Sequence, residues 1–284
     1  MFFTKMHGCG NDYIYIDGSR ERIKPEDKPK IVRFLSDRCC GIGGDGVIFI
    51  NPSSEADFEM EMYNADGSRS EMCGNGIRCV AKYVYDKGLK KETELRIVSA
   101  GKVKELQLSI EDGKVTSVKV NMGAPEFVPE KIPVLASGER VIEEPINVQG
   151  ETYRMTCVSM GNPHAVVFTE DLKGLDIEKI GPAFENHSRF PNRVNAEFVK
   201  VLNRNTVRMR VWERGTGETL ACGTGACAVT VACILNGLTE ERVKVKLTGG
   251  ELDIFWDRTQ NLVYMTGPAT HIFDGEINIE AAYR

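Results

Sequence analysis

The chain has 284 residues, of which 42% are apolar and 27% charged, the proportions of a soluble globular protein with one large or two modest domains. Its net charge of −5 argues against nucleic acid or an anionic membrane surface as the main partner, because basic patches bind both. No run reaches the roughly 18 apolar residues of a membrane span. The first residues turn polar after Phe2 and Phe3, unlike a signal peptide. We therefore expect a cytoplasmic protein.

Strand-like and helix-like segments follow one another along the chain in two similar series. In the first, residues 57–64 (DFEMEMYN) alternate apolar and acidic side chains, as a half-buried strand does, and an apolar helix-like segment follows Cys73. Residues 123–150, with four prolines and mixed charge, form the crossing to the second series. There residues 205–213 (NTVRMRVWE) alternate in the same way, and the segment after Cys222 is apolar on every side. A helix of that kind must be buried all round.

Many short strand-like runs surround these two helices, at 94–99, 103–110, 114–122, 153–159, 165–169, 196–202, 242–247 and 251–256. Few helices separate the runs, so we expect largely antiparallel sheets. The predicted fold class is α+β, with two pseudo-symmetric domains, each a largely antiparallel sheet curled around a central helix. The expected domains are residues 1–122, joined by the C-terminal return 269–284, and residues 123–268.

Cysteine is frequent, with nine residues, but the number is odd and no spacing gives the paired CxxC of a structural zinc site. We expect no metal, and we interpret most of these residues as small buried hydrophobic side chains. This structural interpretation covers Cys9, Cys39, Cys40, Cys79, Cys157, Cys227 and Cys233.

The remaining two cysteines occupy matching places in an internal repeat. When Cys73 is laid on Cys222, an offset of 149, Asn64 falls on Glu213 and both Gly-x-Gly motifs coincide. The "GL" pairs at Gly88 and Gly237, and the segments around Gly101 and Gly250, also coincide; upstream, Gly46 falls on Asn195, and with a two-residue slip Asn11 falls on Asn162. A period this long indicates two similar domains rather than a solenoid.

Each repeat places Cys-Gly-x-Gly between a strand and a helix. Glycine lets the backbone approach a ligand closely, and the first helical turn offers unpaired N–H groups to an anion. A cysteine there is expected to have a lowered pKa. Two such cysteines facing one another suit the inversion of a stereocentre, with a thiolate removing a proton on one face and a thiol returning one on the other.

The motifs resemble those of diaminopimelate epimerases along essentially the whole chain. They are KMHGCGNDY, YNADGS, CGNGIRC, VSMGNPHAV, RVWERGTGETLACGTGACA, TGGELDI and YMTGPA. The family interconverts LL- and meso-2,6-diaminopimelate without pyridoxal phosphate. The resemblance implies the same two-domain fold, an active site between the halves, and no cofactor.

The resemblance also implies the roles of individual residues. Cys73 and Cys222 would be the acid–base pair, and His164 and Glu213 would tune or support them. The N–H groups of Gly74, Asn75, Gly223 and Thr224 would hold the reacting α-carboxylate. Other members of the pocket would be Asn11, Asn64, Asn162, Asn195, Glu213 and Arg214. Arg214 suits the distal carboxylate, and Glu213 an ammonium group. His7, His187 and His271 receive no role.

Local explanations remain open for several of these residues. Asn11, Asn64 and Asn162 are turn formers in their own right, and the neighbouring pair Glu213–Arg214 is ordinarily surface charge. The repeat also pairs Asn64 with Glu213 and Ala65 with Arg214, so the pocket is predicted to be asymmetric where it reads the distal end of the substrate. At the position of Gly46, some members of the family carry glutamine, whereas glycine offers only its backbone for a polar contact.

Three alternative functions are kept. A proline or hydroxyproline racemase or epimerase would share the fold and both cysteines, although Arg214 and the asparagines favour a longer substrate. A thiol-redox or metal-binding protein lacks support from any CxxC pair. A nucleotide-binding enzyme lacks the phosphate-loop and dinucleotide motifs. From the resemblance we further expect a homodimer, with a product used in lysine and peptidoglycan precursor synthesis.

Overall fold

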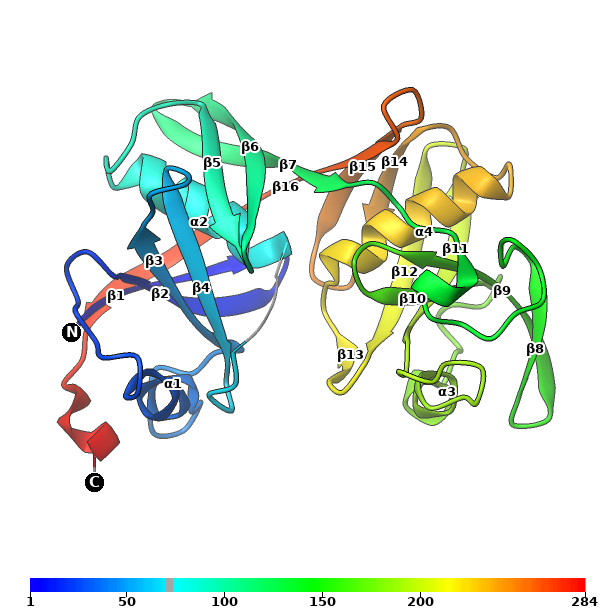
Figure 1. Cartoon of the computed structure of the whole chain (residues 1–284), viewed down its shortest axis with the longest axis horizontal. Helices are drawn as coiled ribbons and strands as arrows, with labels where there is room; N and C mark the ends of the chain where they lie inside the picture. Colours follow the sequence, from blue (N-terminus) through cyan, green and yellow to red (C-terminus); the bar gives the residue numbers. More distant parts are fainter. Residues whose placement is uncertain (70–73, 284) are drawn as a thin grey trace. The chain divides into compact units, whose positions relative to one another are not determined.

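The computed structural model describes residues 1–69 and 74–283, and the chain divides into two compact units. The first consists of Met1–Val120 with Gly267–Arg284, and the second of Asn121–Thr266. In each unit a sheet curls around one helix, α2 in the first and α4 in the second (Figure 1). Among the described residues, no helix is long and apolar enough to cross a membrane.

The sheet of the first unit begins at the last strand of the chain. Successive pairing gives the order β17–β1–β2–β3–β4–β5–β6–β7. The pairs β2–β3 and β4–β5 are parallel and the others antiparallel. The strands are β1 (Phe2–Gly8), β2 (Asn11–Asp17), β3 (Gly46–Pro52), β4 (Phe58–Asn64), β5 (Glu94–Ser99), β6 (Lys102–Glu111), β7 (Lys114–Gly123) and β17 (Thr270–Glu276).

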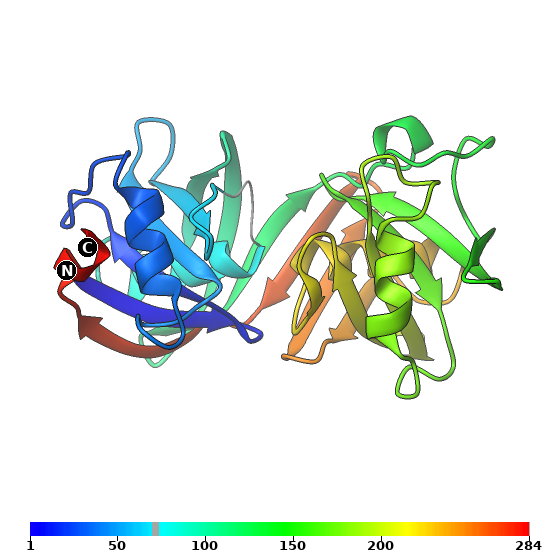
Figure 2. The same cartoon turned by 90° about the horizontal axis from the view of Figure 1, so that it is seen from below.

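Two helices cover the sheet of the first unit. Helix α2 (Gly74–Asp86) packs against β1, β2, β5 and β6 and is buried from Gly74 to Val84. Helix α1 (Lys28–Ser36) packs against β3, β4 and the 3₁₀ helix η2 (Ile279–Tyr283), in a separate apolar cluster with Ile31 and Phe49. The two chain ends lie together in this unit, where the Met1 amino group donates to the Ile277 carbonyl at 2.9 Å (Figures 1 and 2).

The second unit repeats this arrangement. Its pairing order is β8–β9–β10–β11–β12–β14–β15–β16, with the short β13 on β12. Helix α4 (Gly223–Leu235) packs against β9, β10, β11, β14 and β15, and helix α3 (Ile177–Glu185) against β8, β11, β12 and β13. The strands are β8 (Glu144–Val148), β9 (Glu151–Ser159), β10 (Pro163–Phe168), β11 (Asn195–Asn203), β12 (Thr206–Glu213), β13 (Gly217–Thr219), β14 (Arg242–Lys246), β15 (Glu251–Asp257) and β16 (Leu262–Gly267); η1 (Pro129–Lys131) precedes them.

The helices of the two units fall at a constant offset. Helices α1 and α3 begin and end 149 residues apart, and so do α2 and α4. Strand registers agree as well, because Tyr13 pairs with Gly46 in the first unit and His164 with Asn195 in the second. The internal repeat read from the sequence is therefore present in the fold.

The predicted fold class is confirmed, but each unit has an additional helix and some parallel strand pairs. The sequence indicated one helix per unit, and α1 and α3 were not foreseen. Each also explains a parallel pair, since α1 joins β2 to β3 and α3 joins β10 to β11. A chain that crosses over through a helix returns to the same end of the sheet, and so the two strands run in parallel.

Candidate functional site

In the first unit, the predicted residues gather at the first turn of α2. Cys73, which directly precedes this helix in the sequence, lies outside the described residues. Asn75 is buried, and its side chain lies between two others: its Nδ2 donates to Asn11 Oδ1 at 3.5 Å, and its Oδ1 accepts from Arg78 Nη2 at 2.9 Å. The first turn of α2 and the start of β2 are thereby joined through side chains.

A charged network fixes the position of Asn11. Asn11 Nδ2 donates to Asp45 Oδ2 at 2.7 Å, and the same oxygen accepts the Asp12 N–H at 3.1 Å. Arg38 bonds to both Asp12 and Asp45, and Lys5 forms an ion pair with Asp12 at 2.5 Å. Burial alone would raise the pKa of Asp12, but its bonds with Arg38 and Lys5 lower it. Asn11 is thus anchored on an ionised carboxylate cluster.

Asn64 and Gly46 face one another across β3 and β4. Asn64 Nδ2 donates to Ser68 Oγ at 3.0 Å, so its side chain also stabilises the turn that follows β4. At Gly46, an added Cβ would lie 2.0 Å from the Tyr63 carbonyl oxygen and 2.9 Å from the Tyr13 ring. No side chain fits on this backbone, and glycine at this position is a steric requirement here.

Arg78 is a buried cation that the sequence reasoning passed over. Its side chain is inaccessible to solvent, and it donates to the carbonyls of Gly74 at 3.1 Å and Pro268 at 3.2 Å as well as to Asn75. The available signal was a charged residue in the first turns of a largely buried helix. Arg78 holds the start of α2 against the segment that leads into β17.

In the second unit, Cys222 is the N-cap residue of α4. Its sulfur accepts the Gly225 N–H at 3.4 Å and lies 3.5 Å from the Thr224 hydroxyl, and the residue is 5% exposed. Gly223 and Thr224 begin the helix, so their N–H groups belong to the first turn, as predicted. This is the arrangement of a thiol aimed at a helix N-terminal anion site.

The predicted low pKa of Cys222 was wrong. Burial raises its pKa well above the ordinary value, and the charges of Glu213 and Glu197 raise it further. The bonds from Thr224 and Gly225 act in the opposite direction and are outweighed. The physical reason is that loss of water costs a thiolate more than the helix terminus returns.

His164 and Asn162 lie beside this thiol. The His164 ring is fully buried, with Nδ1 2.6 Å from Glu197 Oε1 and Nε2 3.0 Å from Asn162 Oδ1. Asn162 Nδ2 in turn donates to the Thr224 hydroxyl at 3.3 Å. Glu197 was not foreseen, because its contact with His164 depends on the pairing of β10 with β11.

Glu213, Arg214 and Asn195 come together where β11 begins and β12 ends. The Thr219 hydroxyl donates to Glu213 Oε1. Asn195 is buried, and its side chain donates to the Pro163 carbonyl at 2.9 Å and accepts the Arg214 N–H at 2.9 Å. The Arg214 side chain is exposed and reaches the Asn192 carbonyl at 3.0 Å. Asn195 therefore shapes the backbone from which Arg214 extends.

Of the cysteines without an assigned role, most are buried as expected, but Cys39 and Cys40 are exposed because they lie in the turn that follows α1. Burial raises the pKa of Cys233 to about 12 and raises that of Cys157 as well. His7 accepts the Gly10 N–H, His187 contacts the Asn147 carbonyl, and His271 pairs with Asp274. The described residues contain no cluster of metal-ligating side chains.

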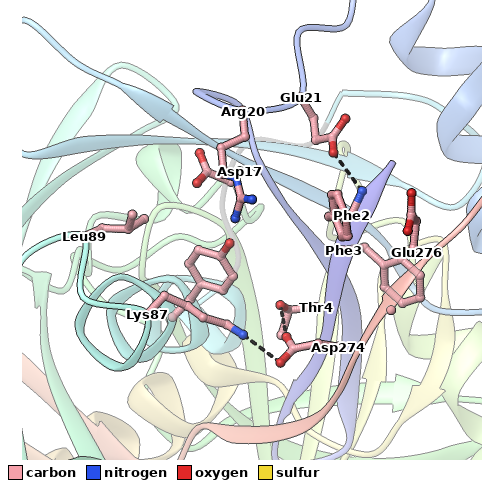
Figure 3. Close-up of a pocket in the computed structure, with 12 residues that line it drawn as sticks. Phe2, Phe3, Thr4, Asp17, Arg20, Glu21, Lys87, Leu89, Asp274 and Glu276 are labelled. Carbon is pink, nitrogen blue, oxygen red and sulfur yellow. Dashed lines mark hydrogen bonds and ion pairs between the residues drawn. The ribbon is translucent and has the colours of Figure 1, made fainter.

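The first unit also has a surface hollow. Figure 3 shows it beside β1 and β17, where Lys87 pairs with Asp274 at 2.7 Å and Thr4 Oγ1 donates to the same carboxylate. The Phe2 N–H bonds to Glu21 at its rim. None of the predicted site residues lines this hollow.

Comparison with known proteins identifies the family. The model of the family described as "Diaminopimelate epimerase" matches residues 3–128 and 156–272. The chain belongs to the diaminopimelate epimerase family. It is 54% identical to the diaminopimelate epimerase of Agathobacter rectalis, over 98% of this chain and 100% of the relative. Identity to that of Methanococcus maripaludis is 53%, with the same coverage of both chains.

Solved structures share the fold at low sequence identity. A phenazine biosynthesis protein of the PhzF family from Bacillus anthracis gives a TM-score of 0.72 at 15% identity, covering 98% of this chain and 99% of that one. A probable proline racemase from Agrobacterium radiobacter gives 0.71 at 15%, covering 98% and 93%. These structures show the shared fold, whereas the family model and the close relatives confirm the predicted family and the prediction of a diaminopimelate epimerase, an isomerase.

Proposed function

We propose that this enzyme interconverts LL- and meso-2,6-diaminopimelate by a two-base mechanism in which Cys73 and Cys222 act on opposite faces of one α-carbon. One cysteine, as thiolate, takes the α-proton and becomes a thiol. The electron pair left on the α-carbon is delocalised into the α-carboxylate. The opposite thiol then donates its proton to the other face and becomes the thiolate, so protons and charge balance and the two roles are exchanged.

The developing charge on the carboxylate requires donors that are already in position. We assign this task to the N–H groups of Gly74, Asn75, Gly223 and Thr224 at the two helix starts, where the helix dipole also favours an anion. No pyridoxal phosphate and no metal enters this scheme.

We assign recognition of the distal end of the substrate to residues that differ between the two repeats. Arg214 binds the distal carboxylate through its guanidinium group, and Glu213 accepts hydrogen bonds from an ammonium group. Asn195 supports this end through its bond to the Arg214 N–H. Asn11, Asn64 and Asn162 supply amide groups around the rest of the substrate.

The observation that carries the proposal is the environment of Cys222. Its thiol caps α4, receives the Gly225 N–H, and adjoins the first-turn N–H groups that suit a carboxylate. Because burial and the two glutamates raise its pKa, Cys222 is protonated at neutral pH. We therefore assign Cys222 as the proton donor of the resting enzyme and Cys73 as the base.

The wider setting follows from this activity. The product serves lysine synthesis, the role of such enzymes, and we propose that it also supplies peptidoglycan precursors. We further propose a cytoplasmic homodimer. Exposed apolar side chains on β1 and β17, namely Phe2, Ile272 and Phe273, support self-association through that edge of the first unit.

Proton NMR of LL-diaminopimelate in D2O, with reduced enzyme and no pyridoxal phosphate, tests the reaction. Loss of the α-proton signal together with the appearance of the meso isomer is the expected result. Exchange with proline or hydroxyproline, and none with diaminopimelate, would keep the chemistry and overturn the substrate. Absence of exchange with all three would overturn the proposal.

A further inference from the structure

A buried carboxylic acid lies next to the predicted site in the second unit. Glu197 is on β11, and its side chain is inaccessible to solvent. Its Oε1 is 2.6 Å from His164 Nδ1, and its Oε2 has no hydrogen-bond partner among the residues that the structure describes. Burying a carboxyl group is costly, and burial raises the pKa of Glu197 although His164 lowers it. Such a group calls for an explanation.

The hydrogen bonds that start at Glu197 run in one direction towards Cys222. Asn162 donates through Nδ2 to Thr224, so the atom that faces His164 is the amide oxygen, which only accepts. His164 Nε2 must therefore carry a hydrogen. The 2.6 Å contact between His164 Nδ1 and Glu197 Oε1 then holds the other side of the ring.

The last hydrogen bonds of this series reach the sulfur of Cys222. The Thr224 hydroxyl accepts from Asn162, which leaves its own hydrogen free to point to Cys222 Sγ, 3.5 Å away. The Gly225 N–H is the second donor to this sulfur, at 3.4 Å. Two donors aimed at one sulfur fix its rotamer and favour the thiolate when it forms.

This series of hydrogen bonds orients the side chains between Glu197 and Cys222 and does not conduct protons. Asn162 stands in the middle, and an amide cannot accept a proton on one side and release one on the other without changing to a high-energy tautomer. Glu197 is therefore no proton source for Cys222.

Packing brings the same groups close to the first turn of α4. A Cβ added at Gly225 would lie 2.8 Å from Glu197 Oε1 and 3.2 Å from Cys222 Sγ. The carboxyl group and the sulfur thus border the same small space at the start of the helix. Displacement of Glu197 would therefore change the packing around Cys222 Sγ and Gly225.

The first unit has no equivalent of this pair. By the 149-residue offset and the strand registers, Glu197 corresponds to Ile48 and His164 to Tyr13. The duplication therefore left a histidine and a glutamate near the start of α4, and a tyrosine and an isoleucine at the equivalent positions of the first unit. A two-base reaction needs one thiol and one thiolate at the start, and unequal surroundings favour one assignment of the two roles over the other.

We propose that Glu197 is a positioning residue for Cys222, holding His164 as the Nε2–H form so that Asn162 and Thr224 direct a hydroxyl donor at the sulfur. Its importance for catalysis rests on the proposed function, but the hydrogen-bond arrangement can be measured without substrate.

The test compares Glu197→Gln with Glu197→Met. The glutamine amide can keep a hydrogen bond to His164 Nδ1, whereas methionine keeps the volume and removes the bond. We expect Glu197→Gln to retain kcat within about threefold and Glu197→Met to lose about 10- to 100-fold in kcat with little change in KM, the scale of a misplaced catalytic group. Equal losses in both variants would overturn the positioning role.

The readout independent of activity is ¹⁵N NMR of the histidine rings, which number only four in this chain. His164 is expected as the Nε2–H form in the wild type and in Glu197→Gln, and as a mixture in Glu197→Met. The matched control is Glu185→Gln, a second buried carboxyl of this unit, bonded to Trp212 and Gly215, which should leave the His164 signals unchanged. An Nδ1–H form in the wild type would overturn the proposal even if the methionine variant does not fold. Absence of turnover on diaminopimelate with the expected spectra would count against the proposed function alone.

Discussion

At Cys222 two opposing effects act on one thiol. The first turn of α4 offers N–H groups, and Gly225 and Thr224 both contact the sulfur, which lowers its pKa. Burial and the charges of Glu213 and Glu197 raise it, and they are the larger effects. A buried, protonated thiol is a poor nucleophile but a suitable acid for a carbanion that forms within the same water-poor space.

The charge on Glu213 can be tested through the reactivity of Cys222. Only the thiolate reacts with iodoacetamide, and its fraction rises tenfold per pH unit below the pKa. The wild-type alkylation rate should therefore keep rising from pH 7 to pH 9. In Glu213→Gln the loss of a nearby negative charge lowers the pKa of Cys222, so the rate at pH 8 should increase about three- to tenfold. Peptide mapping by mass spectrometry measures both rates.

Glu144→Gln provides the control for that experiment. Glu144 also belongs to the second unit and is paired with Arg189 at 2.6 Å, on β8. Neutralising it should leave the Cys222 rate unchanged. A rate in Glu213→Gln equal to that of the wild type would show that Glu213 does not determine the protonation of this thiol.

The sequence indicated which residues gather at each helix start, but not how they bond. Cys222, Asn162, His164 and Thr224 could be named from their motifs, and the structure brings them into one chain of contacts. Glu197 could not be named, because its contact with His164 links residues 33 positions apart and depends on strand register. The pKa of Cys222 was misjudged because burial is a property of the folded unit, not of the motif.

At the scale of the element, the first turn of α4 is limited by space. Gly225 has Glu197 Oε1 and Cys222 Sγ within 3.2 Å of where its Cβ would be. Gly225→Ala should lower the free energy of unfolding by about 1–3 kcal/mol through overpacking. It should also lower kcat about tenfold or more, because the sulfur is displaced. Urea unfolding and steady-state kinetics measure the two effects.

Gly237 at the other end of α4 is the matched control. Its φ is +68°, and no atom lies within 4 Å of an added Cβ. Gly237→Ala should cost roughly 1–2 kcal/mol from the left-handed backbone alone, with kcat unchanged. If both alanine variants lowered kcat alike, the effect would belong to helix stability and not to the contact with Cys222.

Elements with strong patterns were predictable and those with weak patterns were not. Strands β4 and β12 alternate clearly, and α4 is apolar on every side. Helix α1 has only nine residues and a proline in its first turn, and α3 contains Pro182. Their apolar faces pack on strands that lie elsewhere in the sequence, so tertiary packing stabilises these helices more than their own composition does.

At the scale of the whole molecule, duplication has kept the scaffold and changed the side chains. Equivalent positions carry Tyr13 and His164, Ile48 and Glu197, and Asn64 and Glu213. Similar strand pairings thus surround two helix starts with different side chains, Glu213 and Glu197 in the second unit and the buried Arg78 in the first. The surroundings of Cys222 therefore depend on side chains that the first unit does not repeat at the equivalent positions.

The edge of the first unit supports a prediction about assembly. Strand β17 pairs with β1, and along it Ile272 is 46% and Phe273 45% exposed; Phe2, at the start of β1 and beside the hollow of Figure 3, is 54% exposed. Exposed apolar edge strands favour association with another chain, and lysine on such an edge prevents it. We expect the wild type to sediment with twice the 31.6 kDa mass of the chain and Ile272→Lys to sediment as a monomer.

Val103→Lys is the matched control for this prediction, because Val103 is also an exposed apolar residue of the first unit, on β6, at 37% exposure. It should leave the mass unchanged if association depends on β17 and not on apolar exposure in general. Circular dichroism establishes that both variants are folded, since each adds a charge at a site already open to water. A monomeric wild type, or a dimer that survives Ile272→Lys, would exclude this edge as the interface.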